Sequence, residues 1–407
     1  MKATRPPMKI LTALTYYTPH VSGLTVYARR VVKAMVERGH TVTVLTSHYD
    51  RSLPREEMID GARVIRVPVA FRFSKGVIMP TLPWHAARLS MSHDLVYLHL
   101  PQFEACVTAT IARFLARKPV VTKHHCDILL PNRFLRMTFW LPIAISHRIS
   151  ASLSSQIVVS SRDYGENSAF LRRYQHKLLA VYPPMPEAQP DPSNPLNLRD
   201  RYHLNSNQVV GFVGRFAEDK GVRFLIDSIP RVLQHFPNAR FLFVGEREKV
   251  VGEKTYDRLE AKMKELQEHI VLLGVLSDSQ LAEFYRDCDV LALPSINSTE
   301  AFGMVQVEAM LKGTPVIATD LPGVRVAIQA TGMGEIVPPR DEKALADAIV
   351  RVLSDRRRYV KRPDEIRRIF DPQKTFDFYE DLFAAELGMP PLMVSEEEAA
   401  RSGRQAS

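Results

Sequence analysis

The sequence predicts an α/β protein built from two parallel-sheet domains, and three observations carry that prediction. Short apolar runs alternate with helical patterns along most of the chain, which is typical of doubly wound parallel sheets. Residues 183–198 hold six prolines and are typical of a linker. The charge divides at the same place, because residues 1–190 carry 25 Lys and Arg against 11 Asp and Glu, a balance of +14, within a total of +9. We therefore expect two Rossmann-like domains joined by this linker.

These observations also set the expected boundaries. Residues 1–7 are expected to form a disordered lead and residues 389–407 a disordered tail. Residues 8–188 form the first domain and residues 189–371 the second.

Composition excludes several classes of protein. Hydrophobic residues make up 45% of the 407, as in globular domains. The three cysteines, Cys106, Cys126 and Cys288, are too few and too widely spaced for a disulfide framework or a metal cluster, which favours a reducing compartment. No stretch approaches 18 apolar residues and the N-terminus lacks a signal-peptide pattern, so we expect a cytoplasmic protein without a transmembrane helix.

The first domain opens with a strand at 9–14, a loop, a helix at about 25–37 and a strand at 41–46. The loop contains Gly23 but no G-x-G-x-x-G, which disfavours dinucleotide binding. Gly23 either lets a phosphate approach the backbone or only permits a turn, and the sequence leaves both interpretations open. Further strands are predicted at 63–67, 95–99, 119–122, 156–160 and 179–182.

The second domain repeats the alternation. Strands are predicted at 209–213, 240–244, 270–276, 290–293 and 315–319, and helices at 222–235, 277–287, about 302–312, 342–353 and about 372–387. In such sheets the ligand crevice lies outside the carboxyl ends of the strands.

Two carboxylates bracket one of these strand ends. Glu300 lies in the loop after strand 290–293, and Glu308 lies on the helix that follows. A fully helical interval would place them about 12 Å apart, too far for a shared metal. The spacing suits a nucleotide sugar, with phosphates at the helix N-terminus beside Gly303. A surface Glu and a half-buried Glu paired with an arginine explain the spacing equally well.

Two other strand-end loops carry polar groups. Gly214 is followed by Arg215 and, five residues later, by Lys220, so two cations can reach one diphosphate. The alternative is an exposed loop of mixed charge. The second loop, predicted at 123–127, holds His124 and His125, for which ordinary solvated polarity is the alternative. No second cluster of ligands supports metal binding there.

These motifs resemble glycosyltransferase family 4, whose members are retaining enzymes of the GT-B fold. The resemblance implies that the two Rossmann-like domains face each other across a cleft and that a last helix, about 372–388, returns to the first domain. The resemblance covers about residues 8–387 and rests on Glu300, seven residues and Glu308, with F-G after the first Glu and G-T-P-V-I-A after the second. It implies that Glu300 contacts sugar hydroxyls and that Glu308 binds the ribose. The intervening Phe302, Gly303, Met304 and Val305 are then donor-binding residues.

Two further motifs match the family. G-R-x-x-x-x-K-G implies that Gly214, Arg215 and Lys220 hold the donor pyrophosphate. The family pattern Thr-x-His-Ser-Asp selects His125, with Cys126 at the Ser position, as a contact to the transferred sugar. The backbone near Val275 would hold the base. The chain departs from the family at Leu24, where a second glycine is usual, which weakens a phosphate role for Gly23, and at Val326, where a Glu is usual.

The resemblance implies a retaining hexosyltransferase that uses a UDP- or GDP-linked donor, with Glu300, His125, Arg215 and Lys220 as catalytic residues. The acceptor hydroxyl would attack from the front face, and the departing phosphate would help to take its proton. The only Asp-x-Asp, Asp287 to Asp289, precedes its strand and so lies away from the crevice, and we expect no metal and no cofactor. Three alternatives remain: a GT-B epimerase or hydrolase, an NAD(P) oxidoreductase, and a non-catalytic nucleotide-sugar sensor.

A basic amphipathic segment predicts the acceptor. The segment comprises residues 132–149 and contains Pro142, which is expected to kink or end a helix. Such a segment can lie in an anionic membrane surface, which favours a lipid or lipid-linked glycan as acceptor and no nucleic acid. The alternative is that its apolar residues pack in the domain core. The segment interleaves Arg133, Arg136 and Arg148 with Phe134, Leu135, Met137, Phe139, Trp140 and Leu141.

Overall fold

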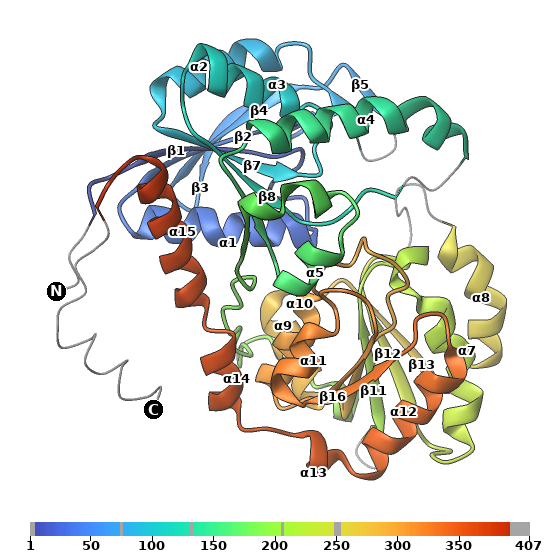
Figure 1. Cartoon of the computed structure of the whole chain (residues 1–407). Coiled ribbons are helices and arrows are strands. Elements are labelled where there is room, and N and C mark those ends of the chain that lie inside the picture. The colour runs from blue at the N-terminus through green and yellow to red at the C-terminus, as the bar shows by residue number, and fades with distance from the viewer. Residues whose placement is uncertain (1–4, 74–75, 130–132, 205–206, 248–253, 391–407) are drawn as a thin grey trace, which may run out of the picture.

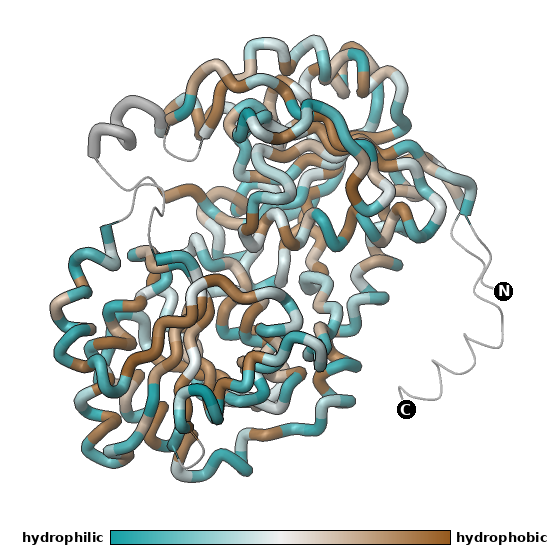
Figure 2. Tube along the Cα trace, turned by 180° about the vertical axis from the view of Figure 1, so that it is seen from behind, coloured by the Kyte–Doolittle hydropathy of each residue, from teal (hydrophilic) through white to brown (hydrophobic). Residues whose placement is uncertain are grey.

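Two α/β domains make up the molecule, one above the other in Figure 1. The computed structural model describes residues 5–73, 76–129, 133–204, 207–247 and 254–390, with the backbone alone for residues 133–139. The hydrophobic stretches gather in the strands of both sheets, as Figure 2 shows. The predicted fold class is confirmed.

The first domain is built on an eight-stranded sheet in the order β10-β9-β8-β7-β1-β2-β4-β3. Every neighbouring pair is parallel except β3 and β4 at one edge, and a separate hairpin joins β5 to β6. The strands are β1 Lys9–Ala13, β2 Thr41–His48, β3 Glu56–Ile59, β4 Ala62–Pro68, β5 Phe71–Phe73, β6 Gly76–Ile78, β7 Leu95–Leu100, β8 Val120–His124, β9 Gln156–Val159 and β10 Leu178–Ala180.

Helices cover both faces of this sheet, as in any parallel sheet that must bury both sides. One face packs against α1 (Gly23–Glu37), and the other packs against α2 (Leu82–Ser92) and α3 (Ala105–Thr110), which continues into the π-helical η1 (Ile111–Leu115). Helix α4 (Arg133–Leu153) lies beside α3, while α5 (Arg162–Asn167) and η2 (Leu171–Lys177) lie near β9 and β10.

The second domain is built on a six-stranded, wholly parallel sheet in the order β13-β12-β11-β14-β15-β16. One face packs against α7, α8 and α12, and the other packs against α9, α10, α11 and α14. The strands are β11 Val209–Val213, β12 Arg240–Val244, β13 Ile270–Gly274, β14 Val290–Leu293, β15 Val316–Thr319 and β16 Gly334–Val337. The helices are α6 Leu198–Arg201, η3 Glu218–Lys220, α7 Val222–Leu233, α8 Thr255–Glu265, α9 Asp278–Asp287, α10 Met304–Leu311, α11 Val326–Thr331, α12 Glu342–Ser354, α13 Arg356–Tyr359 and α14 Pro363–Ile369.

The chain crosses between the domains twice. Residues 181–197 lead down from the first sheet, and the last helix, α15 (Pro372–Glu386), leads back and packs on α1. Its Tyr379 shares a buried hydroxyl hydrogen bond of 2.6 Å with Tyr27, and Asp377 pairs with Arg38 at 2.6 Å. The two crossings touch, because the rings of Tyr182 and Phe370 lie 5.0 Å apart.

Several local predictions are corrected by the structure. Helix α1 begins at Gly23, two residues before the predicted start, and the φ of Gly23 is not positive, so no left-handed turn requires this glycine. Strand β8 continues through His124, so the loop begins at His125 and not at Lys123. Helix α10 begins at Met304, so the interval between Glu300 and Glu308 is only partly helical. Helix α4 continues past Pro142. Antiparallel β3 and the β5–β6 hairpin were not predicted.

Candidate active site

The carboxyl ends of the two sheets face each other (Figure 1), and several predicted site residues lie in the loops and helix starts that follow these strand ends. Glu300 follows β14, and its Oε2 accepts a hydrogen bond of 2.6 Å from Nζ of Lys220, which follows β11. Their side chains are only 14% and 20% exposed. Burial opposes the charge on Lys220, but the carboxylates of Glu300 and Asp219 outweigh it and raise its pKa. The structure thus joins two residues whose motifs lie 80 positions apart.

Lys220 is held in place by the backbone that follows it. Gly221 has a φ of +65°, and a Cβ there would lie 1.9 Å from the carbonyl oxygen of Pro294 at the end of β14. The amide of Ile296 donates to the carbonyl of Asp219 at 3.0 Å, which ties the two loops together. The cation therefore belongs to a fixed strand-end loop and not to the exposed mixed-charge loop of the alternative interpretation.

Gly303 is the N-cap of α10, the helix whose N-terminus was predicted to receive the donor phosphates. Its φ is +76°, and a Cβ would lie 2.4 Å from Cδ2 of Leu293, so both the conformation and the space require glycine. Met304 and Val305 form the first turn, whose backbone N–H groups have no intrahelical partners. The ring of Phe302 is buried against Tyr182, so only its backbone can face a ligand.

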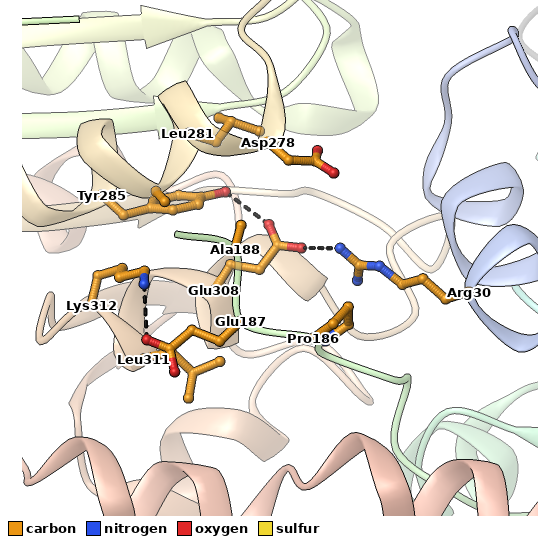
Figure 3. A pocket seen from close by; sticks show the side chains of 11 residues that line it. Arg30, Pro186, Glu187, Ala188, Asp278, Leu281, Tyr285, Glu308, Leu311 and Lys312 are labelled. Atoms are coloured by element: carbon orange, nitrogen blue, oxygen red, sulfur yellow. Dashed lines mark hydrogen bonds and ion pairs between the residues drawn. The ribbon is translucent and has the colours of Figure 1, made fainter. Parts of the chain in front are cut away.

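Glu308 joins the two domains, as Figure 3 shows. Its Oε1 lies 3.0 Å from the guanidinium of Arg30 on α1, and its Oε2 accepts from the hydroxyl of Tyr285 at 3.1 Å. Arg30 also donates to the carbonyl of Pro184 at 3.0 Å. Burial and the Glu308 carboxylate raise the pKa of Tyr285. The alternative of a half-buried Glu paired with an arginine is thus present in the structure, although a carboxylate keeps further acceptor capacity for a ligand.

The other predicted donor residues lie at several strand ends and helix starts of the two domains. Burial and the charge of Arg215 lower the pKa of His20, which places this arginine near the β1–α1 loop of the opposite domain. Gly23 faces Met304, since a Cβ on Gly23 would lie 3.7 Å from the methyl of Met304. Gly214 packs so closely against Gly245 that a Cβ on Gly245 would lie 2.1 Å from its carbonyl oxygen. Val275 is 71% exposed just beyond β13.

The two histidines after Lys123 have different environments. His124 is buried in β8 and lies 3.2 Å from Oδ1 of Asp127. His125 is half-buried, and its Nε2 lies 2.8 Å from Nδ1 of His99 on the neighbouring strand. Neither is an ordinary solvated side chain. His99 was not singled out from the sequence, because it stands inside an apolar strand with no motif around it.

A second pair of charges ties the domains together. Asp163 at the start of α5 accepts from the guanidinium of Arg325 at 2.6 Å and from the amide of Gly323 at 2.7 Å. Arg325 lies one residue before Val326, where the chain departs from the family pattern. Sequence spacing did not indicate Arg30, Asp163 or Arg325 as site residues, because each partner comes from the other domain.

The aspartates of the Asp-x-Asp are engaged elsewhere. Asp289 precedes β14, accepts from the amide of Val209 at 2.8 Å and lies 3.7 Å from Arg199. Within the described residues, no group of three or more His, Cys, Asp or Glu side chains could hold a metal ion. Within the same part of the chain, no helix is both long and apolar enough to cross a membrane.

Comparison with known proteins identifies the family. Residues 22–184 match the glycosyl transferase 4-like domain, and residues 207–355 match the glycosyl transferases group 1 domain. The chain belongs to the family 4 glycosyltransferases. It is 29% identical over 357 residues to the phosphatidyl-myo-inositol mannosyltransferase of Mycobacterium leprae, a match covering 86% of this chain and 89% of that protein. It is 26% identical over 366 residues to an uncharacterized glycosyltransferase of Methanocaldococcus jannaschii, covering 86% and 90%.

Solved structures agree on the fold of this glycosyltransferase. Anabaena HepE in complex with UDP-glucose superposes with a TM-score of 0.73 at 22% identity, covering 93% of this chain and all of that one. Sucrose-phosphate synthase from Thermosynechococcus elongatus superposes with a TM-score of 0.70 at 20% identity, covering 93% and 100%. The GT-B fold expected from the resemblance is confirmed.

Proposed function

We propose that this glycosyltransferase moves a sugar from a UDP- or GDP-linked donor to a hydroxyl of a lipid or lipid-linked glycan, with retention of configuration. The observation that carries the proposal is that Lys220 pairs with Glu300 in the loop just before α10, the helix that carries Glu308. An anion site with a carboxylate on each side matches a diphosphate with a hydroxylated sugar at one end and a ribose at the other.

Each side chain then has a task in the reaction. Glu308 accepts hydrogen bonds from the ribose hydroxyls, and Glu300 accepts them from the sugar. Arg215, Lys220 and the first turn of α10 hold the pyrophosphate and stabilise the charge that grows on it as the bond to the anomeric carbon breaks. The acceptor oxygen bonds to the anomeric carbon on the same face, and its proton passes to the departing phosphate oxygen.

We propose that transfer needs no metal, because Arg215 and Lys220 supply the positive charge that the diphosphate requires. The Asp287 and Asp289 carboxylates lie at the opposite end of β14 from Glu300. Chelation with EDTA should leave the transfer rate unchanged, and restoration of a lost rate by Mg²⁺ or Mn²⁺ would contradict the proposal.

Donor binding is tested by thermal unfolding against a panel of UDP- and GDP-sugars. A donor at 100-fold its Kd should stabilise the protein by about 2.7 kcal/mol, which is a readily measured rise in Tm. Incubation of the bound donor with and without lipid acceptors then separates the activities. Transfer only with acceptor supports the proposal, whereas free sugar or an epimerised donor without acceptor supports a hydrolase or an epimerase. NMR of the product's anomeric centre tests retention.

The relative from Mycobacterium leprae carries a lipid acceptor in its name, and the first domain has a surface suited to a membrane. Leu141, Ile145 and Ile149 recur every four residues on α4 and are 55%, 46% and 39% exposed, beside Trp140 at 51%. They do not pack in the domain core, contrary to the alternative interpretation. Arg148 is exposed on the same helix. Asn132 lies outside the described residues, as do the side chains of residues 133–139, which include Arg133 and Arg136.

We therefore propose peripheral attachment through α4, with the +14 charge of residues 1–190 drawing the domain to anionic lipid. Leu141→Glu with Ile145→Glu should abolish co-sedimentation with anionic liposomes at low salt. Met58→Glu is the control, because Met58 is 64% exposed on β3. Arg133→Glu with Arg136→Glu tests the neighbouring turn. Equal sedimentation of wild type and the α4 variants would remove the helix as the anchor.

A further inference from the structure

A second histidine, His99, lies directly against His125. Strands β7 and β8 are parallel neighbours with Leu100 opposite His124, and the amide of His125 donates to the carbonyl of Leu100 at 2.9 Å. This register brings Nδ1 of His99 to 2.8 Å from Nε2 of His125, with the ring planes 19° apart. The two imidazoles therefore share one hydrogen bond.

The burial of His99 decides the direction of that bond. Its side chain is fully buried, and its Nε2 has no hydrogen-bond partner within the described part of the chain. A neutral imidazole carries one N–H and one lone pair. A hydrogen on Nε2 would be an orphaned buried donor, which is rarer in proteins than an orphaned acceptor. Nδ1 of His99 is therefore the donor, and Nε2 of His125 is the acceptor.

The charges around the pair favour neutral rings. Burial lowers the pKa of His99 to about 3, and the nearby Lys123 acts in the same direction. Burial, His99 and Lys123 hold the pKa of His125 well below its ordinary value. Lys123 is itself fixed, since its Nζ donates to Ser160 at 3.1 Å and lies over the ring of Tyr27 at 4.7 Å.

The other ring nitrogen of His125, Nδ1, is the one that a ligand can reach. If Nε2 accepts from His99 and the ring is neutral, the hydrogen must lie on Nδ1. Among the described residues, Nδ1 has no protein partner, and it is not one of the buried unpartnered atoms. It is therefore free to donate to a bound molecule.

We propose that His99 is a positioning residue that fixes the hydrogen of His125 on Nδ1, so that His125 offers an N–H donor to a hydroxyl of the transferred sugar. The sugar contact rests on the proposed function, whereas the hydrogen position does not. A neutral donor has a clear advantage here, because an imidazolium would repel the positive charge that develops at the anomeric carbon. Without His99, an imidazole in water prefers its hydrogen on Nε2.

The hydrogen position is read directly by ¹⁵N NMR of the histidine side chains in the donor-free protein. Wild type should show His125 protonated at Nδ1 and unprotonated at Nε2. His99→Phe keeps a ring of similar size but removes the donor, so His125 should no longer be held in the Nδ1–H form and the Nε2–H form should become populated beside it. His99→Asn places an amide N–H near the former Nδ1 and should restore the wild-type signal. A hydrogen on Nε2 of His125 in wild type overturns the proposal.

Kinetics test the consequence. His99→Phe should lower kcat by about tenfold, the effect of one lost hydrogen bond, and leave the Kd of the nucleoside diphosphate alone unchanged. His99→Asn should recover most of the rate. In a His125→Ala background, adding His99→Phe should not lower kcat any further. An equal loss in both backgrounds overturns the positioning role. If wild type transfers no sugar but carries the Nδ1 hydrogen, the proposed function fails and the positioning by His99 stands.

Discussion

Replacing Lys220 with alanine is expected to lower kcat by more than about 100-fold, as is Arg215→Ala. Lys220 is a mostly buried cation, and it already has a carboxylate, Glu300, at 2.6 Å. The charge on the leaving diphosphate is greatest in the transition state, so a preorganised cation acts more strongly there than on the bound donor. The raised pKa of Lys220 keeps it charged at neutral pH and above.

The measurement is a single-turnover rate together with the affinity for a donor analogue. Lys262→Ala is the matched control, because Lys262 also pairs with a carboxylate, Asp227, in the same domain but on α8. The control should turn over at the wild-type rate. Near-normal turnover of Lys220→Ala with the analogue still bound would refute the role of Lys220 at the diphosphate.

Glu308→Gln is expected to weaken donor binding by about 1.5–3 kcal/mol, a factor of roughly 10 to 100 in Kd. Glutamine keeps the shape of the side chain but loses the charge that strengthens hydrogen bonds from ribose hydroxyls. The substitution also weakens the pair with Arg30, so donor affinity alone does not isolate the ribose contact.

A 2′-deoxy nucleotide isolates the ribose contact. Wild type should bind the ribonucleotide more tightly than its 2′-deoxy analogue, and Glu308→Gln should bind the two more nearly equally. Glu187→Gln is the matched control, since Glu187 lines the pocket shown in Figure 3 together with Glu308 but pairs with Lys312 and Arg367. A donor Kd that is the same in Glu308→Gln and wild type would sink the ribose assignment.

The sequence could predict the parts of this molecule that depend on local pattern. Apolar runs located nearly every strand of the two sheets, and motif spacing named Glu300, Glu308, Arg215 and Lys220. It could not show that Glu300 binds Lys220, because the contact depends on how two loops pack at Gly221 and Pro294. Arg30 is 278 residues from Glu308 and lies on an ordinary helix, so only the placing of the domains reveals the pair.

Other differences have equally specific causes. Phe302 belongs to a motif, yet its ring packs in the core with Tyr182 and Phe370, since an aromatic side chain buries a large apolar area. Pro142 was expected to kink or end a helix, and the structure excludes only the second outcome, because α4 runs on to Leu153. The edge strand β3, Glu56–Ile59, was missed because it is only four residues long and half of these are polar, as edge strands often are.

The two touching crossings have a mechanical consequence. Tyr182 and Phe370 lie 5.0 Å apart, and the hydroxyl of Thr375 donates to the carbonyl of Tyr182 at 2.9 Å. Because the two connections touch, we expect them to act as a single hinge for rigid-body rotation of the second domain. Such a rotation would have to break the two ion pairs between the domains, Arg30–Glu308 and Asp163–Arg325. If Glu308 binds the ribose, as proposed, then donor binding and rotation at the hinge both depend on this carboxylate.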